Sequence, residues 1–144
     1  MGSRLIPTLL ERGHGITALA RPESQSKLAR GCTPVLGNAL DGDSYAQSIG
    51  ACDTFVQLVG VAHPSPAKAR EFVEIDQKSA MEAIRVAAEA RIAHFVYVSV
   101  AHPAPMMKAY IEVRAAGEEM IRAAGLNATS TAAIPASRAA RLVA

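Results

Sequence analysis

Short apolar runs rich in β-branched residues alternate with helical segments along most of this 144-residue chain. The run HFVYVSV, residues 94–100, is apolar almost throughout, which is typical of a strand covered on both faces. Apolar residues at helical spacing predict helices on either side of it, over 67–90 and 107–124. Such alternation predicts the α/β class, with a doubly wound parallel sheet between helix layers.

The remaining segments fit the same alternation. The chain opens on an amphipathic helix that Gly13 ends, and residues 130–144 form an Ala-, Ser- and Arg-rich tail, expected to be poorly ordered or a short helix apart from a candidate strand over 129–134. Residues 1–129 are therefore expected to form one domain. Between its ends we expect strands over 16–19, 34–37 and 54–60, and helical segments over 23–30 and 43–50.

Composition excludes several classes of partner. The formal net charge is +2 with both signs interspersed, and the chain has three Tyr, three Phe and no basic run, so no nucleic-acid partner is expected. No stretch reaches about 18 apolar residues, and the chain does not open like a secretory leader, so we expect no membrane segment and a cytoplasmic location. Cys32 and Cys52 form no metal-type or redox-type pair, and no metal site is expected.

A doubly wound sheet binds ligands beyond the carboxyl ends of its strands, here in the loops after Leu19, Leu36, Leu58 and Val98. A complete dinucleotide-binding sheet begins with one more strand and a glycine-rich turn that holds the pyrophosphate. Neither precedes the first helix of this sequence. Gly2 would then be the last glycine of that turn, at the point where the helix packs closely on the strand.

Five stretches of the chain resemble the atypical short-chain dehydrogenase/reductases, NAD(P)-binding Rossmann proteins that include NmrA-like and epimerase-like members. They are GSRLIPTLLERGHGITALAR, VLGNALD, DTFVQLVG, AMEAIRVAAEARIAHFVYVS and AAGEEMIRAAGLNAT. The likeness runs from Gly2 to about Thr129. It implies a Rossmann-like, three-layer domain truncated at its N-terminus, without the first strand and glycine-rich turn. The C-terminus diverges too, because STAAIPASRAARLVA replaces the strand and arginine-proline pair of the family.

The resemblance assigns cofactor contacts to the loops after the strands. Arg21 stands where a carboxylate would bind the ribose of NAD, and an arginine there favours the extra phosphate of NADP, so NADP is expected over NAD. Asn38 and Asp41 correspond to positions along the adenine, and Gly60 and Val61 to positions near the nicotinamide ribose. The alternatives are a solvated arginine, ordinary turn residues and a glycine that merely ends a strand.

The resemblance also places catalytic candidates at Ser99, Tyr110 and Arg114. In classical members, a serine orients the substrate carbonyl and a tyrosine delivers a proton, while a lysine four residues later lowers the pKa of the tyrosine. Here that lysine is Arg114, one helical turn from Tyr110, and the spacing between Ser99 and Tyr110 is shorter than in the classical pattern. The alternative is that Tyr110 packs against the nicotinamide or the core.

Other polar residues receive simpler interpretations. The loops HPSP and HPAP carry His63 and His102, which could converge on a substrate, although prolines in such loops are explained by stiffening alone. The neighbouring Glu118 and Glu119 are expected to form solvated pairs with Arg114 and Arg122 on the last helix.

Two classes of function remain open. The first is an NADP-dependent oxidoreductase or epimerase-like enzyme acting on a small carbonyl or hydroxyl compound. The second is a non-catalytic, NmrA-like module that senses nucleotide or binds a partner. A third outcome is an inactive fragment, since without the first strand two neighbouring strands would have unpaired edges unless they close up on each other. We expect weak cofactor affinity of this chain, because it lacks the backbone cradle for the pyrophosphate. The oligomeric state is not predicted.

Overall fold

The computed structural model describes residues 1–49, 52–100 and 107–133. Strands and helices alternate in the predicted order. None of the helices in these ranges is long and apolar enough to cross a membrane. The strands are β1 (Thr17–Ala20), β2 (Thr33–Leu36), β3 (Thr54–Gln57), β4 (His94–Val100) and β5 (Ala128–Ala133), and the α-helices are α1 (Gly2–Glu11), α2 (Ala69–Glu71), α3 (Lys78–Glu89) and α4 (Lys108–Ala123).

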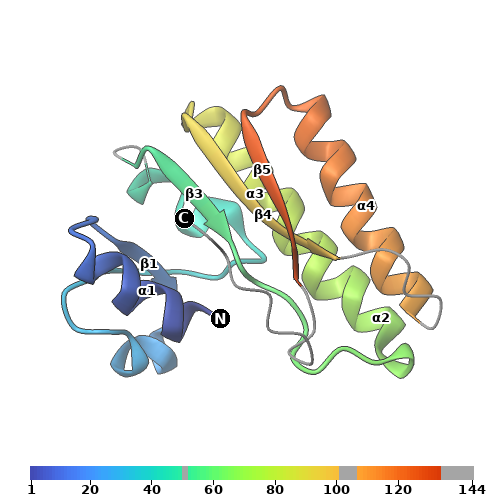
Figure 1. Ribbon diagram of the computed structural model, residues 1–144, viewed down its shortest axis with the longest axis horizontal. Coiled ribbons are helices and arrows are strands. Elements are labelled where there is room, and N and C mark those ends of the chain that lie inside the picture. Colours follow the sequence, from blue (N-terminus) through green and yellow to red (C-terminus); the bar gives the residue numbers. More distant parts are fainter. Residues whose placement is uncertain (50–51, 101–106, 134–144) are drawn as a thin grey trace.

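All strand pairs in the described residues are parallel, but they form two sheets instead of one. β1 pairs with β2, and β3, β4 and β5 pair in that order. Figure 1 shows α3 and α4 on one side of the three-stranded sheet, with α1 and β1 as a second group on the other side. The α/β class and parallel pairing are confirmed, and among the described strands β1 and β3 have not closed up on each other.

The predicted strand over 129–134 is found as β5, and residues 134–144 of the predicted tail lie outside the described residues. Two predicted helices are wrong in type. Residues 23–30 form a 3₁₀ helix only over Pro22–Lys27, because Leu28 returns to an extended backbone. In the predicted helix over 43–50, two 3₁₀ turns replace a continuous helix, because the backbone of Tyr45 leaves the helical region between them. That break lets the Tyr45 side chain enter the core.

The helix predicted over 67–90 contains an irregular segment. Residues Phe72–Gln77 form a π-helical segment between α2 and α3, and a 3₁₀ turn over Pro66–Lys68 precedes them. Such widened turns are frequently found at functional sites. The segment buries Phe72 and Asp76 completely or almost completely, so it determines how this part of the chain faces the sheet.

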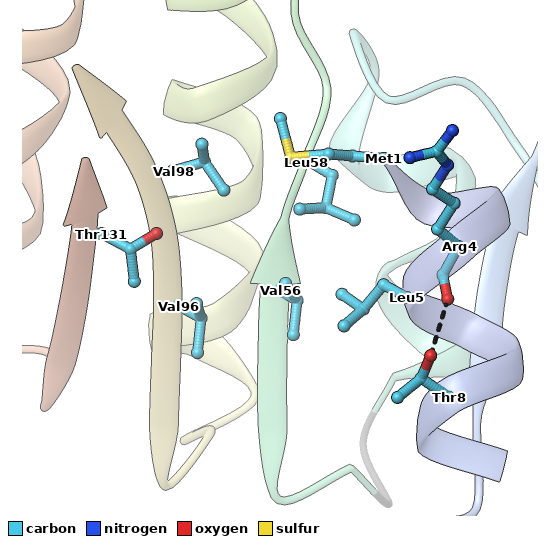
Figure 2. A pocket seen from close by; sticks show the side chains of 9 residues that line it. All are labelled: Met1, Arg4, Leu5, Thr8, Val56, Leu58, Val96, Val98 and Thr131. Carbon is cyan, nitrogen blue, oxygen red and sulfur yellow. Dashed lines mark hydrogen bonds between the residues drawn. The ribbon is translucent and has the colours of Figure 1, made fainter. Parts of the chain in front are cut away.

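The core lies between the three-stranded sheet and the two helices α3 and α4. Phe95 and Tyr97 of β4 are fully buried there, and the ring of Phe95 stacks on Phe55 with centroids 5.5 Å apart. The intervening residues Val96 and Val98 are only half-buried. Helices α3 and α4 thus cover the face of β4 that carries Phe95 and Tyr97, whereas the opposite face, toward α1, is covered only in part (Figure 2).

Tyr45 provides a measurable consequence of this packing. Burial, with a smaller contribution from Glu82, raises the pKa of its hydroxyl from the usual value near 10 to about 12. Between pH 10 and pH 12 the unfolded chain loses this proton while the folded chain keeps it, so stability falls as pH rises, by about 3 kcal/mol. Urea denaturation across this range should show that decline, and Tyr45→Phe should reduce it by about that amount, leaving the contribution of the buried Tyr97. An equal decline in both proteins would contradict the assignment.

Candidate active site

The most deeply buried charges lie where the three-stranded sheet ends. Asp76 of the π-helical segment is 0% exposed, and Arg114 of α4 is 5% exposed. The Arg114 guanidinium donates through Nη2 to Asp76 Oδ1, so the two side chains form a buried ion pair. A buried carboxylate and a buried guanidinium each need such a partner, because an unpaired charge in the interior is costly.

The same guanidinium also connects the sheet to α4. Its Nη1 donates to the carbonyl oxygen of Val98 at 3.1 Å, near the end of β4. Its Cζ lies 5.6 Å from the ring centroid of Tyr97 and 5.1 Å from that of Tyr110, distances at which cation–π attraction operates. Arg114 therefore contacts the ring of Tyr110, and two of its donor nitrogens are used by Asp76 and Val98.

The loop after β3 is fastened to this ion pair. The second carboxylate oxygen of Asp76 accepts the N–H of Val61 at 2.9 Å. The neighbouring Gly60 lies so close that a Cβ there would stand 2.6 Å from Arg114 Nη2 and 2.7 Å from Asp76 Oδ1. Only glycine therefore fits at this position, because any side chain would overlap the ion pair. The predicted cofactor positions Gly60 and Val61 thus lie together with the predicted catalytic residue Arg114.

Burial changes the titration of this group of residues. It raises the pKa of the Asp76 carboxyl above its usual value, against the lowering effect of the Val61 N–H and the Arg114 guanidinium. It also raises the pKa of the Tyr97 hydroxyl, which has no hydrogen-bond partner among the described residues. Tyr97 therefore stays a neutral phenol at neutral pH.

The other catalytic candidates lie on the same side of the sheet. Ser99 is buried near the end of β4, and Tyr110 lies in the first turn of α4 with its ring centroid 5.1 Å from that of Phe72. Tyr110 borders a small cavity of about 200 Å³. The cavity is lined by Pro66, Phe72, Met107, Lys108, Ala109 and Tyr110. This space adjoins the predicted proton donor, and Lys108 is the charged side chain among its described lining residues.

The predicted adenine-side residues lie beyond the two-stranded sheet. Arg21 follows β1 with 69% of its side chain exposed, and its Nε lies 3.2 Å from Glu23 Oε1. Asn38 follows β2, and its Oδ1 accepts the N–H of Leu40 at 3.0 Å. The carbonyl oxygen of Asp41 accepts the hydroxyl of Ser44 at 2.6 Å. Asn38 and Asp41 thus form hydrogen bonds within the turn, as the alternative interpretation as ordinary turn residues allowed. Both residues are also exposed to solvent.

The remaining predicted residues are scattered. Gly2 begins α1, and a Cβ there would meet only Leu58 Cδ1, at 3.9 Å. His63 is exposed in the loop after β3, while His102 lies outside the described residues. The expected solvated pairing of Arg114 with Glu118 or Glu119 is wrong, because the buried Asp76 takes that guanidinium.

Sequence reasoning missed Asp76, although a signal was present. Asp76 follows Phe72 by four residues and precedes Ser79 by three, so it lies on the apolar stripe that predicted the long helix. An acidic residue on a buried helix face requires a cation nearby. Arg114 is that cation, whereas the family resemblance assigned Arg114 a role beside Tyr110.

Comparison with known proteins identifies the family and the fold of the chain. A family model described as NAD(P)H-binding matches residues 1–131. No curated protein sequence matches the chain. Three similar solved structures are WbmH of Bordetella bronchiseptica in complex with NAD⁺ (20% identity, TM-score 0.70), the UDP-glucose 4-epimerase of Thermus thermophilus with NAD (13%, 0.72) and a short-chain dehydrogenase/reductase superfamily protein of Agrobacterium tumefaciens with bound NAD (18%, 0.68).

These alignments cover 90% of the present chain, but only 50%, 50% and 44% of the three other chains. The present chain thus spans about half the length of the structures it matches. At such identities the likeness shows the fold alone, which is the Rossmann-like fold shared by epimerases and short-chain dehydrogenase/reductases. Together with the family model, which matches most of the chain, this confirms the predicted resemblance. The chain belongs to the NAD(P)H-binding family.

Proposed function

We propose that the carboxyl edge of the strands binds NADP in preference to NAD. Arg21 supports this, because it stands exposed directly after β1 and an arginine can pair with the extra phosphate of NADP. In this arrangement Asn38 and Asp41 lie along the adenine, Gly60 and Val61 approach the nicotinamide ribose, and Gly2 lies beside the pyrophosphate. The structures of similar fold hold NAD, which makes the choice between the two cofactors a necessary test.

We propose further that the full-length protein is an NADP-dependent oxidoreductase or epimerase-like enzyme for a small carbonyl or hydroxyl compound. The observation that carries this is the position of Tyr110. It borders a cavity, and its ring contacts Arg114, whose guanidinium lies against the loop of Gly60 and Val61. The cofactor would supply or accept hydride when bound. Ser99 would orient the substrate oxygen, Tyr110 would deliver or accept its proton, and Arg114 would hold the Tyr110 ring in place.

One observation favours the second candidate, a non-catalytic nucleotide-sensing or partner-binding module. The Nη atoms of Arg114 donate to Asp76 and Val98. Arg114 contacts the ring of Tyr110, but no hydrogen bond among the described residues joins it to the Tyr110 hydroxyl. A reaction test separates the two candidates. Full-length protein incubated with NADPH and a panel of small aldehydes and ketones oxidises the cofactor if it is an enzyme, whereas binding without turnover identifies the module.

Cofactor affinity of residues 1–144 is expected to be weak, with a dissociation constant above the micromolar range, because the described residues contain no strand followed by a glycine-rich turn that could hold the pyrophosphate. A fluorescence titration with NADPH measures it, and a micromolar or tighter constant would contradict the expectation. NADPH should bind about tenfold more tightly than NADH, since one charge-assisted contact is worth about that much.

The residue responsible is tested with one variant and one control. Arg21→Ala should abolish the preference for NADPH over NADH, whereas Arg12→Ala, an exposed arginine at the end of α1, should preserve it. If the preference persists in Arg21→Ala, Arg21 does not bind the phosphate. If NADH binds more tightly in the unmodified chain, the cofactor assignment itself is wrong.

A further inference from the structure

The cavity beside Tyr110 has a size and a lining that restrict what can fill it. It has a volume of about 200 Å³ and lies among the 3₁₀ turn that begins at Pro66, the π-helical segment at Phe72 and the residues that begin α4. A cavity of about 150 Å³ in another protein holds one benzene ring. The present cavity therefore accommodates one six-membered ring with a short substituent.

Two aromatic side chains form part of the cavity lining. Phe72 is 1% exposed, and the centroid of its ring lies 5.1 Å from that of Tyr110, with the two ring planes tilted by 57°. The Cζ of Arg114 lies 5.1 Å from the Tyr110 centroid, so both rings are held by their neighbours. An aromatic ligand can add edge-to-face or offset-stacked contacts to such a pair, whereas a saturated ring cannot.

Lys108 adds a positive charge where the cavity opens to solvent. It lines the cavity, yet 85% of its side chain is exposed, so its ammonium group lies at the opening. Its Nζ lies 3.8 Å from Glu112 Oε1, which is too long for a direct hydrogen bond. The ammonium group can therefore turn to an anion at the opening without breaking a hydrogen bond to that carboxylate.

We infer that this cavity binds a single aromatic ring that carries a carboxylate, with the ring against Phe72 and Tyr110 and the carboxylate at Lys108. A sugar ring of the same size is disfavoured, because its hydroxyl groups would lose their hydrogen bonds to water. Among the described lining residues, only Lys108 and Tyr110 have polar side-chain groups that could replace those bonds. A ring without a charge fills the cavity but gains nothing from Lys108.

The proposed function gives this ligand a reacting group, and only this step of the inference rests on that proposal. The substrate would be an aromatic aldehyde or ketone whose ring carries a carboxylate. Its carbonyl carbon would accept hydride from NADPH and its oxygen the proton of Tyr110, which yields the alcohol and NADP⁺. A proton from solvent then restores the Tyr110 hydroxyl. The carboxylate takes no part in the reaction and only holds the ring in place.

Ligand binding to the 144-residue chain tests the inference without a cofactor. Benzoate is the probe, and its dissociation constant is expected to be about millimolar for so small a ligand. Benzyl alcohol, which lacks the charge, and cyclohexanecarboxylate, which lacks the aromatic ring, should each bind about threefold more weakly. Glucuronate, a carboxylate on a sugar ring, should bind at least about tenfold more weakly. Equal binding of benzoate and glucuronate, or no saturable benzoate binding, would overturn the inference.

Amide chemical shifts in a nuclear magnetic resonance titration locate the ligand. Benzoate should move the signals of Phe72 and of residues 107–110, which line the cavity. The open cleft between α1 and the three-stranded sheet, lined in part by Leu5, Val56 and Val98, provides the comparison (Figure 2). Shifts confined to that cleft would place the ligand elsewhere and overturn the inference.

Removing the charge of Lys108 tests the role of the carboxylate. Lys108→Met should weaken benzoate binding about threefold, as expected for an exposed ion pair, and should leave the affinity for benzyl alcohol unchanged. Lys78→Met is the matched control, because Lys78 also pairs with a glutamate four residues later but is not among the described lining residues of the cavity. Unchanged benzoate affinity in Lys108→Met would overturn the inference.

Filling the cavity tests the position of the ring. Ala109 lines the cavity and is half-buried, so Ala109→Leu places additional carbon atoms there. This variant should weaken benzoate and benzyl alcohol alike, by at least about fivefold, because the ring loses its space. Unchanged affinity in the folded variant contradicts the inference. If circular dichroism shows that Ala109→Leu is unfolded, the exposed Lys108→Met decides the test.

The reaction and the binding site can fail separately. If benzoate binds at Lys108 but the full-length protein reduces no aromatic aldehyde with NADPH, the binding site stands and the proposed enzymatic function fails. If the full-length protein reduces aliphatic aldehydes while benzoate does not bind, the proposed function stands and the inference is wrong.

Discussion

Replacing Arg114 with methionine is expected to lower the free energy of unfolding by about 3–5 kcal/mol, because the substitution leaves the Asp76 carboxylate buried without its cation. It also removes the bond to the carbonyl of Val98. Urea denaturation followed by circular dichroism measures the loss. Arg122→Met is the matched control, since Arg122 lies on the same helix and is exposed, and its stability should change by less than about 0.5 kcal/mol.

The partner of the pair provides the second half of this test. Because a neutral amide costs less to bury than an unpaired carboxylate, the double variant Asp76→Asn/Arg114→Met should be more stable than Arg114→Met alone. The two substitutions are therefore expected to be far from additive. If the double variant is as unstable as the sum of the two single variants, the two side chains do not stabilise the fold as a pair.

Replacing Gly117 with alanine is the other substitution with a large expected effect. Gly117 lies on α4 directly against Tyr97, where an added Cβ would overlap the hydroxyl and stand 2.7 Å from its Cζ. Tyr97 is fully buried and cannot move aside, so overpacking should cost about 1–3 kcal/mol, which exceeds the gain that alanine normally gives in a helix. Thermal or urea unfolding measures the loss.

A second-site change gives this prediction its control. Tyr97→Phe removes the hydroxyl, which has no partner among the described residues, so it should cost little by itself and should recover part of the stability lost in Gly117→Ala. Gly2→Ala is the matched glycine control, because the nearest atom to its new Cβ is 3.9 Å away and stability should be unchanged or slightly higher. A full loss with Tyr97→Phe present would show that another contact is responsible.

The elements that sequence reasoning predicted best are those with a strong local pattern. The strand at His94–Val100 was predicted at its observed bounds, and the last helix was predicted to within one residue at each end, because their apolar periodicity is long and uninterrupted. The short segments around Pro22 and Tyr45 were assigned the wrong type of helix. Their backbone follows from tertiary packing, above all the burial of Tyr45, which no local pattern records.

The candidate site follows the same division. Loop positions such as Arg21 and Gly60 could be found from the sequence, since in a doubly wound sheet the carboxyl ends of the strands determine where ligands bind. The ion pair between Asp76 and Arg114 could not, because it joins residues 38 positions apart and depends on the widened helical turn at Phe72–Gln77. Pairing at this separation is a property of the folded chain rather than of any short motif.

The absence of a shared ladder between the two sheets of the described residues also affects how the molecule holds together. The smaller group, α1 with β1 and β2, packs on the main core through Leu19 and Val35, and the turn after β2 adds polar contacts to α3, among them the Gly42 N–H to Glu82 at 3.2 Å and the ion pair of Asp43 with Arg85. The larger group has its own core and its own buried charges. Because no backbone ladder joins the two sheets, opening the smaller group breaks side-chain contacts but no strand pairing of the larger one, and the amide hydrogens of β1 and β2 are expected to exchange faster than those of β4.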